Sequence, residues 1–234
     1  MRTVNAIKFD ILFQLRHGFY YAYLFVTAIY VLALLNLPES IRPTVTILLL
    51  FTDTTMLGFF FIGAIVLLEK SQNIHESLFV TPLRVSEYFF SKVFSLMILS
   101  ILSSLIIALA ANGKIHNFLL FTIGLILTSC FFTLSGFVFA SRAKNVNDYF
   151  ARALGMGLGL SLPIMGFFHV FETPIYYLFP TQATLIFLNA AFVETKSSEL
   201  IYALVCLILW TGVAARMAYL AFEKHIILKI GGRQ

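Results

Sequence analysis

Long apolar runs separated by short polar segments dominate the hydrophobic pattern of this chain. A helix needs about 20 mostly apolar residues to cross the roughly 30 Å of hydrocarbon in a bilayer. Six runs reach that length, and their expected positions are residues 19–37, 45–68, 93–111, 118–140, 153–171 and 200–222. The pattern predicts an all-α polytopic membrane protein with six transmembrane helices in one domain over residues 1–234.

The segment before the first run, residues 1–18, has the periodicity of an amphipathic helix. Its apolar side chains recur at helical spacing, at Val4, Ile7, Ile11, Leu12 and Leu15. This predicts a helix lying in the inner membrane interface, with a turn at His17-Gly18 before the first span. The alternative is a simple extension of that span. The segment lacks a signal peptide's apolar core, so the first span is expected to direct insertion.

Residues 172–199 form a second departure from the pattern of spans. They are apolar, but Pro174 and Pro180 interrupt them. A seventh span here would also place the basic C-terminus on the outer side. We therefore expect a re-entrant or interfacial helical hairpin in the outer leaflet, because irregular backbone at membrane depth needs protein or a cavity around it.

Composition and charge support this topology. Hydrophobic residues make up 60% of the chain and charged residues only 12%, about half of what a soluble domain carries. Thirteen of the 16 lysine and arginine residues fall on the side that includes both termini, which the positive-inside rule places in the cytoplasm. The net charge of +5 follows from this topology, and no nucleic-acid partner is expected.

Catalytic and metal-binding motifs are missing from the sequence. There is no G-x-x-x-x-G-K-[ST] phosphate loop, no H-E-x-x-H and no G-x-S-x-G. The five histidines are scattered without metal-ligand spacing, and Cys130 and Cys206 lie inside apolar runs. We therefore expect neither an enzyme nor a metal or cofactor bound by this chain.

Two intramembrane features are candidates for a transport pathway or for helix–helix contacts. Asp53 lies within the second span, where an ionisable group is costly to bury; it serves either transport or a hydrogen bond to a neighbouring threonine. Gly155 and Gly159 in the fifth span allow close helix approach, and Pro163 should kink that helix. Packing within the subunit is the expected use of these glycines, with a dimer seam or conduit wall as the alternatives.

The longest inner loop, residues 69–92, has the features of two short helical pieces. Asn73 is placed to cap a helix over residues 74–80, because its side chain can accept from free N–H groups there. Thr81-Pro82 then matches an N-cap followed by proline at the first helical position. The second piece would continue into the third span.

This loop resembles the cytoplasmic loop of type-2 ABC exporter permeases, through Glu69 at the end of the second span, the short helix, Thr81-Pro82-Leu83, and Tyr88 and Lys92 at the start of the third span. The segment Arg16–Tyr20, the six spans and the broken outer hairpin agree with that family. The resemblance implies that the short helix docks into a groove on a separate ATPase subunit. Its apolar ridge would be Ile74, Leu78 and Phe79, with His75, Glu76 and Ser77 at the rim.

The resemblance also implies a function. The chain would be one permease of a homo- or heterodimer in a bacterial cell membrane, with ATP and Mg²⁺ bound by the partner ATPase. Its cargo would be a small amphipathic or hydrophobic molecule, drug or lipid-like. The short chain and Arg16–Tyr21 are similar to drug-export permeases, including those for fluoroquinolones. A haem-exporter-type permease is the alternative within the family.

Two alternatives come from other classes of protein. A secondary transporter or channel would need carboxylates for a coupling ion in several spans, and only Asp53 is clearly intramembrane. An intramembrane enzyme would need a catalytic constellation, which the sequence does not show.

Overall fold

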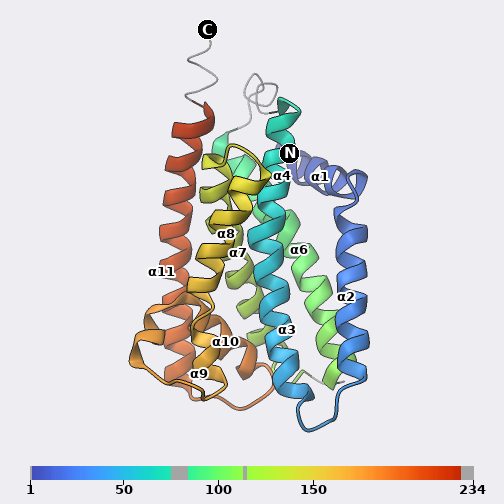
Figure 1. Cartoon of the computed structure of the whole chain (residues 1–234), viewed down its shortest axis with the longest axis vertical. Helices are drawn as coiled ribbons and strands as arrows, with labels where there is room; N and C mark the ends of the chain where they lie inside the picture. Colours follow the sequence, from blue (N-terminus) through green and yellow to red (C-terminus); the bar gives the residue numbers. More distant parts are fainter. Residues whose placement is uncertain (1, 75–83, 113–114, 228–234) are drawn as a thin grey trace.

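The chain folds into a bundle of helices that run along one long axis (Figure 1). The structure, a computed structural model, describes residues 2–74, 84–112 and 115–227. In chain order the helical elements are α1 (Arg2–Arg16), α2 (Phe19–Leu35), α3 (Arg42–Met56), the π-helix η1 (Leu57–Phe61), α4 (Ile62–Ser71), α6 (Val85–Asn112), α7 (Phe118–Arg142), α8 (Val146–Leu160), α9 (Pro163–Phe167), the 3-10 helix η2 (Pro174–Leu178), α10 (Pro180–Ala190), α11 (Ser197–Phe222) and the π-helix η3 (Glu223–Ile227).

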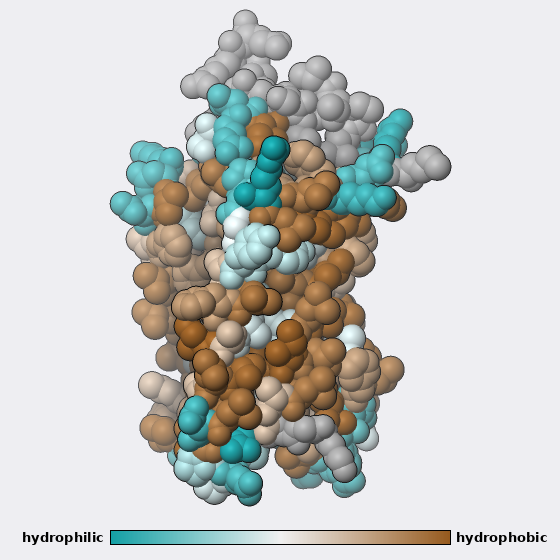
Figure 2. All heavy atoms as spheres, turned by 90° about the vertical axis from the view of Figure 1, so that its right-hand side faces the viewer, coloured by the Kyte–Doolittle hydropathy of each residue, from teal (hydrophilic) through white to brown (hydrophobic). Residues whose placement is uncertain are grey.

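The membrane-spanning segments agree with the hydrophobic pattern. Among the described residues, five helical segments are long and apolar enough to cross a membrane: Arg42–Ser71, Val85–Ala111, Phe118–Arg142, Val146–Phe167 and Ser197–Ile227. The bent pair α1 and α2 gives a sixth. Figure 2 shows an apolar band between two hydrophilic ends on the face that it displays. The prediction of an all-α polytopic membrane protein is therefore confirmed.

Two of these helices, α6 and α8, begin about two turns earlier than the apolar runs suggested. At the start of α6, the Arg84 N–H donates to Glu87 Oε2 at 2.8 Å. At the start of α8, the Asn145 side chain accepts from the Asp148 N–H at 2.8 Å. Because these carboxylate and amide side chains satisfy the free N–H groups of the first turn, each helix extends into polar sequence. Arg84, directly before α6, is not helical, and the expected start at Pro82 lies outside the described residues.

Helix α1 is a separate helix and not an extension of the first span, since it meets α2 at 68°. Figure 1 shows it lying across the end of the bundle. Gly18 makes the bend with a φ of 80°, in the left-handed region that glycine adopts without a Cβ clash. The buried face of α1 consists of Asp10, Phe13 and Gln14, whereas Leu12 of its apolar stripe is 64% exposed. This inverted amphipathicity suits a helix that turns its apolar stripe to lipid.

The predicted outer hairpin is helical and broken, formed by η2 and α10. Tyr202 Oη on α11 donates to the Tyr177 carbonyl at 2.6 Å, and Trp210 Nε1 donates to the Leu178 carbonyl at 3.1 Å. Thr181 Oγ1 bonds to the Leu160 carbonyl at 2.6 Å. Protein groups therefore satisfy the Tyr177 and Leu178 carbonyls and the Thr181 hydroxyl, as a position within the membrane requires, whereas the buried Gln182 Oε1 has no hydrogen-bond partner among the described residues.

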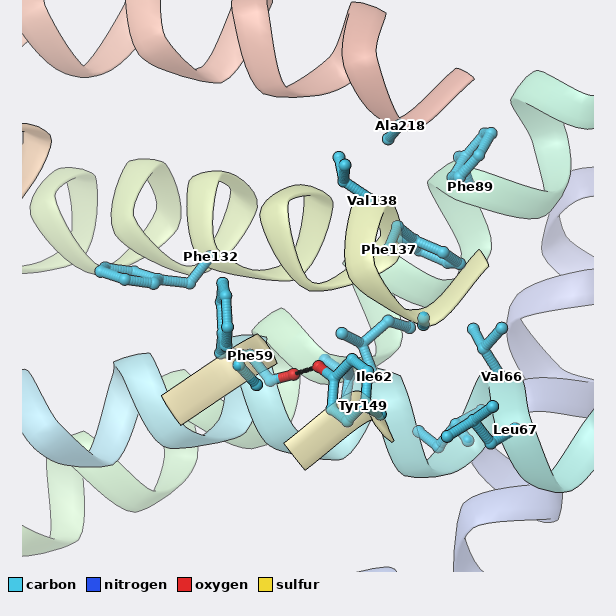
Figure 3. Close-up of a cluster of buried hydrophobic side chains, with 14 of the residues drawn as sticks. Phe59, Ile62, Val66, Leu67, Phe89, Phe132, Phe137, Val138, Tyr149 and Ala218 are labelled. Carbon is cyan, nitrogen blue, oxygen red and sulfur yellow. Dashed lines mark hydrogen bonds between the residues drawn. The ribbon is translucent and has the colours of Figure 1, made fainter. Parts of the chain in front are cut away.

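The main hydrophobic core lies toward the end of the bundle that carries α1, and Figure 3 shows part of it. It joins α1, α2, η1, α4, α6, α7, α8 and α11. Backbones of η1 and α7 approach closely at Gly58, where a Cβ would lie 2.7 Å from Phe132 Cβ. We call this end of the bundle the basic end, because it holds most of the described lysines and arginines, namely Arg16, Lys70, Arg84, Lys92, Arg142, Lys144, Arg152 and Lys224.

Candidate functional site

The loop between α4 and α6 contains most of the residues that were predicted to dock an ATPase. Those outside the described residues are His75, Glu76, Ser77, Leu78, Phe79, Thr81 and Pro82. Ile74 packs against the main core of this chain. Asn73 has a left-handed φ of 54°, and its N–H donates to the Lys70 carbonyl at 3.3 Å. It thereby ends α4, and its predicted role as an N-cap stays a prediction.

Glu69 and Lys92, which were predicted to flank this loop, meet in a buried ion cluster at its base. Lys92 Nζ donates to the carboxylates of both Glu69 and Asp10. The exposed fractions are 0% for Glu69, 1% for Lys92 and 3% for Asp10. The ion cluster (Asp10, Glu69, Lys92) therefore connects α1 to the last turn of α4 and to the second turn of α6.

Neighbouring polar contacts fix the geometry of the ion cluster. Tyr88 Oη donates to Glu69 Oε2 at 2.6 Å, and the Lys92 ammonium lies 5.6 Å from the ring centroid of Phe13. One turn further along both helices, Gln14 Nε2 donates to Ser95 Oγ at 2.7 Å. Bonds at two levels therefore oppose rotation of α1 against α6.

The electrostatics of the ion cluster make it costly to separate. Burial raises the pKa of the Asp10 carboxyl, and the positive charge of Lys92 opposes that rise. Removing an ion from water costs several kcal/mol even after relaxation, and a buried ion is tolerated only with a well-placed partner. Movement that parted α1 from α6 would leave such ions without partners. The cluster is therefore expected to move as a unit.

Asp53 of α3 is 1% exposed and lies between α2, α3 and α6. Its Oδ2 accepts from Ser103 Oγ at 2.9 Å and lies 3.5 Å from Ser104 Oγ. The expected threonine partners are replaced by these two serines of α6. They lie 50 and 51 positions away in the chain, which is why local sequence did not reveal them. Asp53 thus forms a helix–helix contact inside the subunit.

A π-helical turn, η1, interrupts the second span directly after α3. Tyr149 of α8 donates its hydroxyl to the Phe59 carbonyl within this turn, as the dashed line in Figure 3 shows. π-turns inside α-helices are frequent at functional sites because they displace the backbone from regular bonding. The bond from Tyr149 makes α8 sensitive to any rearrangement of that turn.

Two glycines of α8 lie away from any close helix contact: Gly155 is exposed, and Gly159 is half-buried and lines a cavity. A Cβ built on Gly155 or Gly159 would meet no atom within 4 Å. The expectation that these glycines serve packing within the subunit is therefore wrong, and the dimer seam and the conduit wall remain. Pro163 is buried and begins α9 after a two-residue turn. The helix is therefore interrupted before Pro163, which is more than the predicted kink.

Two cavities adjoin α8. The smaller, of about 150 Å³, lies between the α3–η1 segment, α7 and α8, with Phe51, Phe60 and Leu158 in its wall. The larger, of about 590 Å³, lies between α7, α8, η2 and α11. Both have mainly apolar linings, which suits a hydrophobic or amphipathic ligand. Asp53 lines neither of them.

Sequence reasoning missed Asp10 and Tyr149. The signal for Asp10 was available: it shares one face of α1 with Phe13 and Gln14, at the i, i+3 and i+4 positions. A carboxylate and an amide on the face away from the apolar stripe point toward a protein partner. Tyr149 offered no such signal, since its hydroxyl bonds to a carbonyl 90 positions away.

Comparison with known proteins agrees with this architecture. The model of the fluoroquinolones export permease protein family matches residues 1–230. Fluoroquinolones export permease proteins from two strains of Mycobacterium tuberculosis are 29% identical over 233 residues, which is 98% of this chain and 98% of each relative. The match therefore extends over α1, the α4–α6 loop and every predicted span. It confirms the resemblance to ABC-type exporter permeases that the loop residues indicated.

Proposed function

Because the chain belongs to the fluoroquinolones export permease protein family, we propose that it is the membrane-spanning permease subunit of an ATP-driven exporter. A separate ATPase subunit binds ATP and Mg²⁺ and supplies the energy. A second permease completes the transporter, and the basic end faces the cytoplasm. The cargo is a small amphipathic drug, and the names of the relatives favour a fluoroquinolone.

The observation that carries the coupling part of this proposal is the ion cluster at the base of the α4–α6 loop. ATP-driven approach of two ATPase subunits would displace the loop that docks on them. Because Lys92 binds both Glu69 and Asp10, such a displacement would move α4, α6 and α1 together. The cluster thus supports transmission of force from the loop to the membrane-embedded helices.

The π-turn offers a route from the loop to the cargo. Displacement of α4 would act on η1, the segment directly before it, and the bond from Tyr149 to the Phe59 carbonyl would pass the movement to α8. The smaller cavity lies between these elements, and its phenylalanine side chains offer the ring faces against which a planar aromatic drug can stack. We assign the wall formed by η1 and α8 to the cargo pathway.

A secondary transporter fits these observations less well. Coupling to an ion would require a carboxylate that faces a pathway. Asp53, the acid predicted for such a role, instead contacts Ser103 within the subunit. This placement favours the ATP-driven mechanism.

The proposal can be tested in inverted membrane vesicles that contain the permease together with a candidate ATPase subunit that carries a phosphate loop. We expect fluoroquinolone to accumulate inside these vesicles when ATP and Mg²⁺ are added, and not with a non-hydrolysable ATP analogue. A matched control is the same ATPase with its phosphate-loop lysine replaced. Accumulation that ignores ATP but follows an imposed proton gradient would show a secondary transporter instead.

A further inference from the structure

The larger cavity has the dimensions of a ligand site and is open on one side of the bundle. Its volume of about 590 Å³ lies in the range of about 300–1,000 Å³ that is usual for small-molecule sites. Helices α7, α8 and α11 form its walls, with Phe131, Leu160 and Met217 among the lining residues. Apart from Ser135 and Arg142, every lining residue is apolar.

The cavity occupies one half of the membrane thickness. Along α7 its lining extends from Phe131 to Arg142, which corresponds to roughly 16 Å at the helical rise. Half of the hydrocarbon core is about 15 Å thick. The floor contains Leu178 of η2, whose carbonyl accepts from Trp210 Nε1 at 3.1 Å. Trp210 lies at the middle of α11, so the re-entrant segment closes the cavity near the midplane.

A single charged side chain, Arg142, stands at the basic end of the cavity. It is exposed, and no described residue forms a hydrogen bond or ion pair with its guanidinium. Arg152 differs from Arg142, because its positive charge is paired with the carboxylate of Asp148. A guanidinium donates two parallel hydrogen bonds to a phosphate and holds it more firmly than a neutral hydroxyl donor.

We propose that this cavity binds an anionic phospholipid from the leaflet at the basic end, with the phosphate on Arg142 and an acyl chain along α7 toward Trp210. The chain fills the apolar space between α8 and α11 over the depth of one leaflet. The anionic lipids of the cytoplasmic leaflet supply the matching headgroup. The lipid is a structural component of the α7–α8–α11 wall, and the site does not depend on the drug proposed as cargo.

Trp210 makes the site directly measurable, since it is the only tryptophan among the 234 residues and lines the cavity. The purified full-length protein is reconstituted in phosphatidylcholine vesicles, and dibrominated phosphatidylglycerol or dibrominated phosphatidylcholine is added. Bromine on the acyl chain quenches a nearby indole. We expect half-maximal quenching at a mole fraction about fivefold lower for the anionic lipid, the factor expected for one basic side chain.

Three variants test the role of Arg142. Arg142→Gln should remove the preference for the anionic lipid, and Arg142→Lys should keep part of it. Lys144→Gln removes the same charge from the same end but outside the lining, and it should leave the preference unchanged. Thermal unfolding of each variant confirms that the exposed substitution has not altered the fold.

Several results would overturn the assignment. Equal quenching by the two lipids, or an unchanged preference in Arg142→Gln, would mean that no headgroup site exists there. Quenching by neither lipid would mean that another chain covers the cavity. Displacement of the brominated phosphatidylglycerol by a fluoroquinolone, weakened in Arg142→Gln, would assign the cavity to the cargo and not to a lipid.

Discussion

Lys92 illustrates how a buried charge can join three helices that hydrophobic packing alone would let slide. Its ammonium has two carboxylate partners, on α1 and α4, and an aromatic ring beside it. Apolar contacts between helices are non-directional, whereas each bond of the ion cluster requires one geometry. The residue therefore fixes the register of α1 and α4 against α6.

Replacing Lys92 by methionine should destabilise the protein by about 3–5 kcal/mol, because Asp10 and Glu69 would remain buried without their counter-ion. The measurement is the thermal unfolding midpoint of the purified permease in detergent. Arg152→Gln is the control, since its ion pair with Asp148 is exposed to solvent and screened, so its loss should barely shift the unfolding midpoint.

A neutral version of the cluster separates charge from packing. Asp10→Asn combined with Glu69→Gln and Lys92→Met leaves no buried ion and keeps similar side-chain volumes. We expect it to recover most of the stability that Lys92→Met alone loses. If the single and the triple variant unfold at the same temperature, the loss comes from packing and the ion cluster has no electrostatic role.

Asp53→Asn should retain most transport, because an amide oxygen can accept the Ser103 hydrogen bond that Asp53 Oδ2 accepts. Asp53→Leu should impair folding, since it would leave the hydroxyls of Ser103 and Ser104 without this acceptor in the interior. Drug efflux at matched expression distinguishes the two. Loss of efflux in a well-expressed Asn variant would restore Asp53 to the transport pathway.

At the scale of elements, the spans were predictable and their ends were not. Hydrocarbon thickness forces about 20 apolar residues on each span, so the runs of this sequence located α2, α3–α4, α6, α7, α8 and α11. The starts of α6 and α8 depend on side chains such as Glu87 and Asn145 that cap polar turns. Hydropathy does not register such caps.

The ion cluster could not be derived from the pattern, because its residues are far apart in sequence. Asp10 lies 82 positions from Lys92, and Glu69 lies 23 positions away. Sequence similarity to a family drew attention to Glu69 and Lys92 but not to their contact. Which charges meet depends on how α1 folds back across the bundle, and only the three-dimensional arrangement shows that.

The two kinds of glycine in this fold should respond oppositely to alanine. Gly58→Ala should destabilise by about 1–3 kcal/mol, because its Cβ would lie 2.9 Å from the Thr133 backbone nitrogen. Gly155→Ala meets no atom within 4 Å and should stabilise α8 by up to about 1 kcal/mol. The unfolding midpoints of both variants, purified as isolated subunits, provide the comparison.

The Gly155→Ala variant also tests the outer face of α8. If that face forms a seam with a second permease, Gly155→Ala should lower the dimer fraction while raising the stability of the monomer. A dimer fraction that stays unchanged would leave the conduit wall as the role of Gly155. Destabilisation of the monomer by Gly155→Ala would contradict the open surroundings of this glycine.

For the whole molecule, the proposed coupling to an ATPase would act at the basic end. Elements α1, α4, α6 and η3 meet at the basic end. Lys70 Nζ of α4 donates to the Ala143 carbonyl at 3.0 Å, which ties the connection between α7 and α8 to them. We expect this end to face the cytoplasm. Cysteines placed at the exposed residues Ser71 and Asn147 should resist an impermeant thiol reagent added to intact cells.

Cysteines at the opposite end provide the positive control for this topology. Ser40, Asn117 and Ser197 are exposed there and should react with the same reagent from outside. The background is Cys130→Ala with Cys206→Ala, which removes the two native thiols. Labelling of position 71 in intact cells, with position 40 protected, would show that the basic end faces the outside instead.

Docking of the ATPase and transmission of its movement should be separable in the whole transporter. An apolar anchor buried at an interface is worth more than about 1 kcal/mol and sometimes 2 or more. Leu78→Ala with Phe79→Ala, in the loop outside the described residues, should therefore release the ATPase. His75→Ala, at the predicted rim, should have a smaller effect. Co-purification of the ATPase with each variant in nanodiscs measures this step.

The neutral triple variant of the ion cluster should behave in the opposite way. Its loop is intact, so the ATPase should still co-purify with it. Its α1 and α4 are no longer held to α6 by charge, so drug-stimulated ATP hydrolysis and drug transport should fall while basal hydrolysis continues. Normal drug stimulation in this variant would show that force reaches the helices without the ion cluster. Retention of the ATPase by the Leu78–Phe79 double variant would instead remove the docking role from the loop and leave the cluster as a purely structural joint.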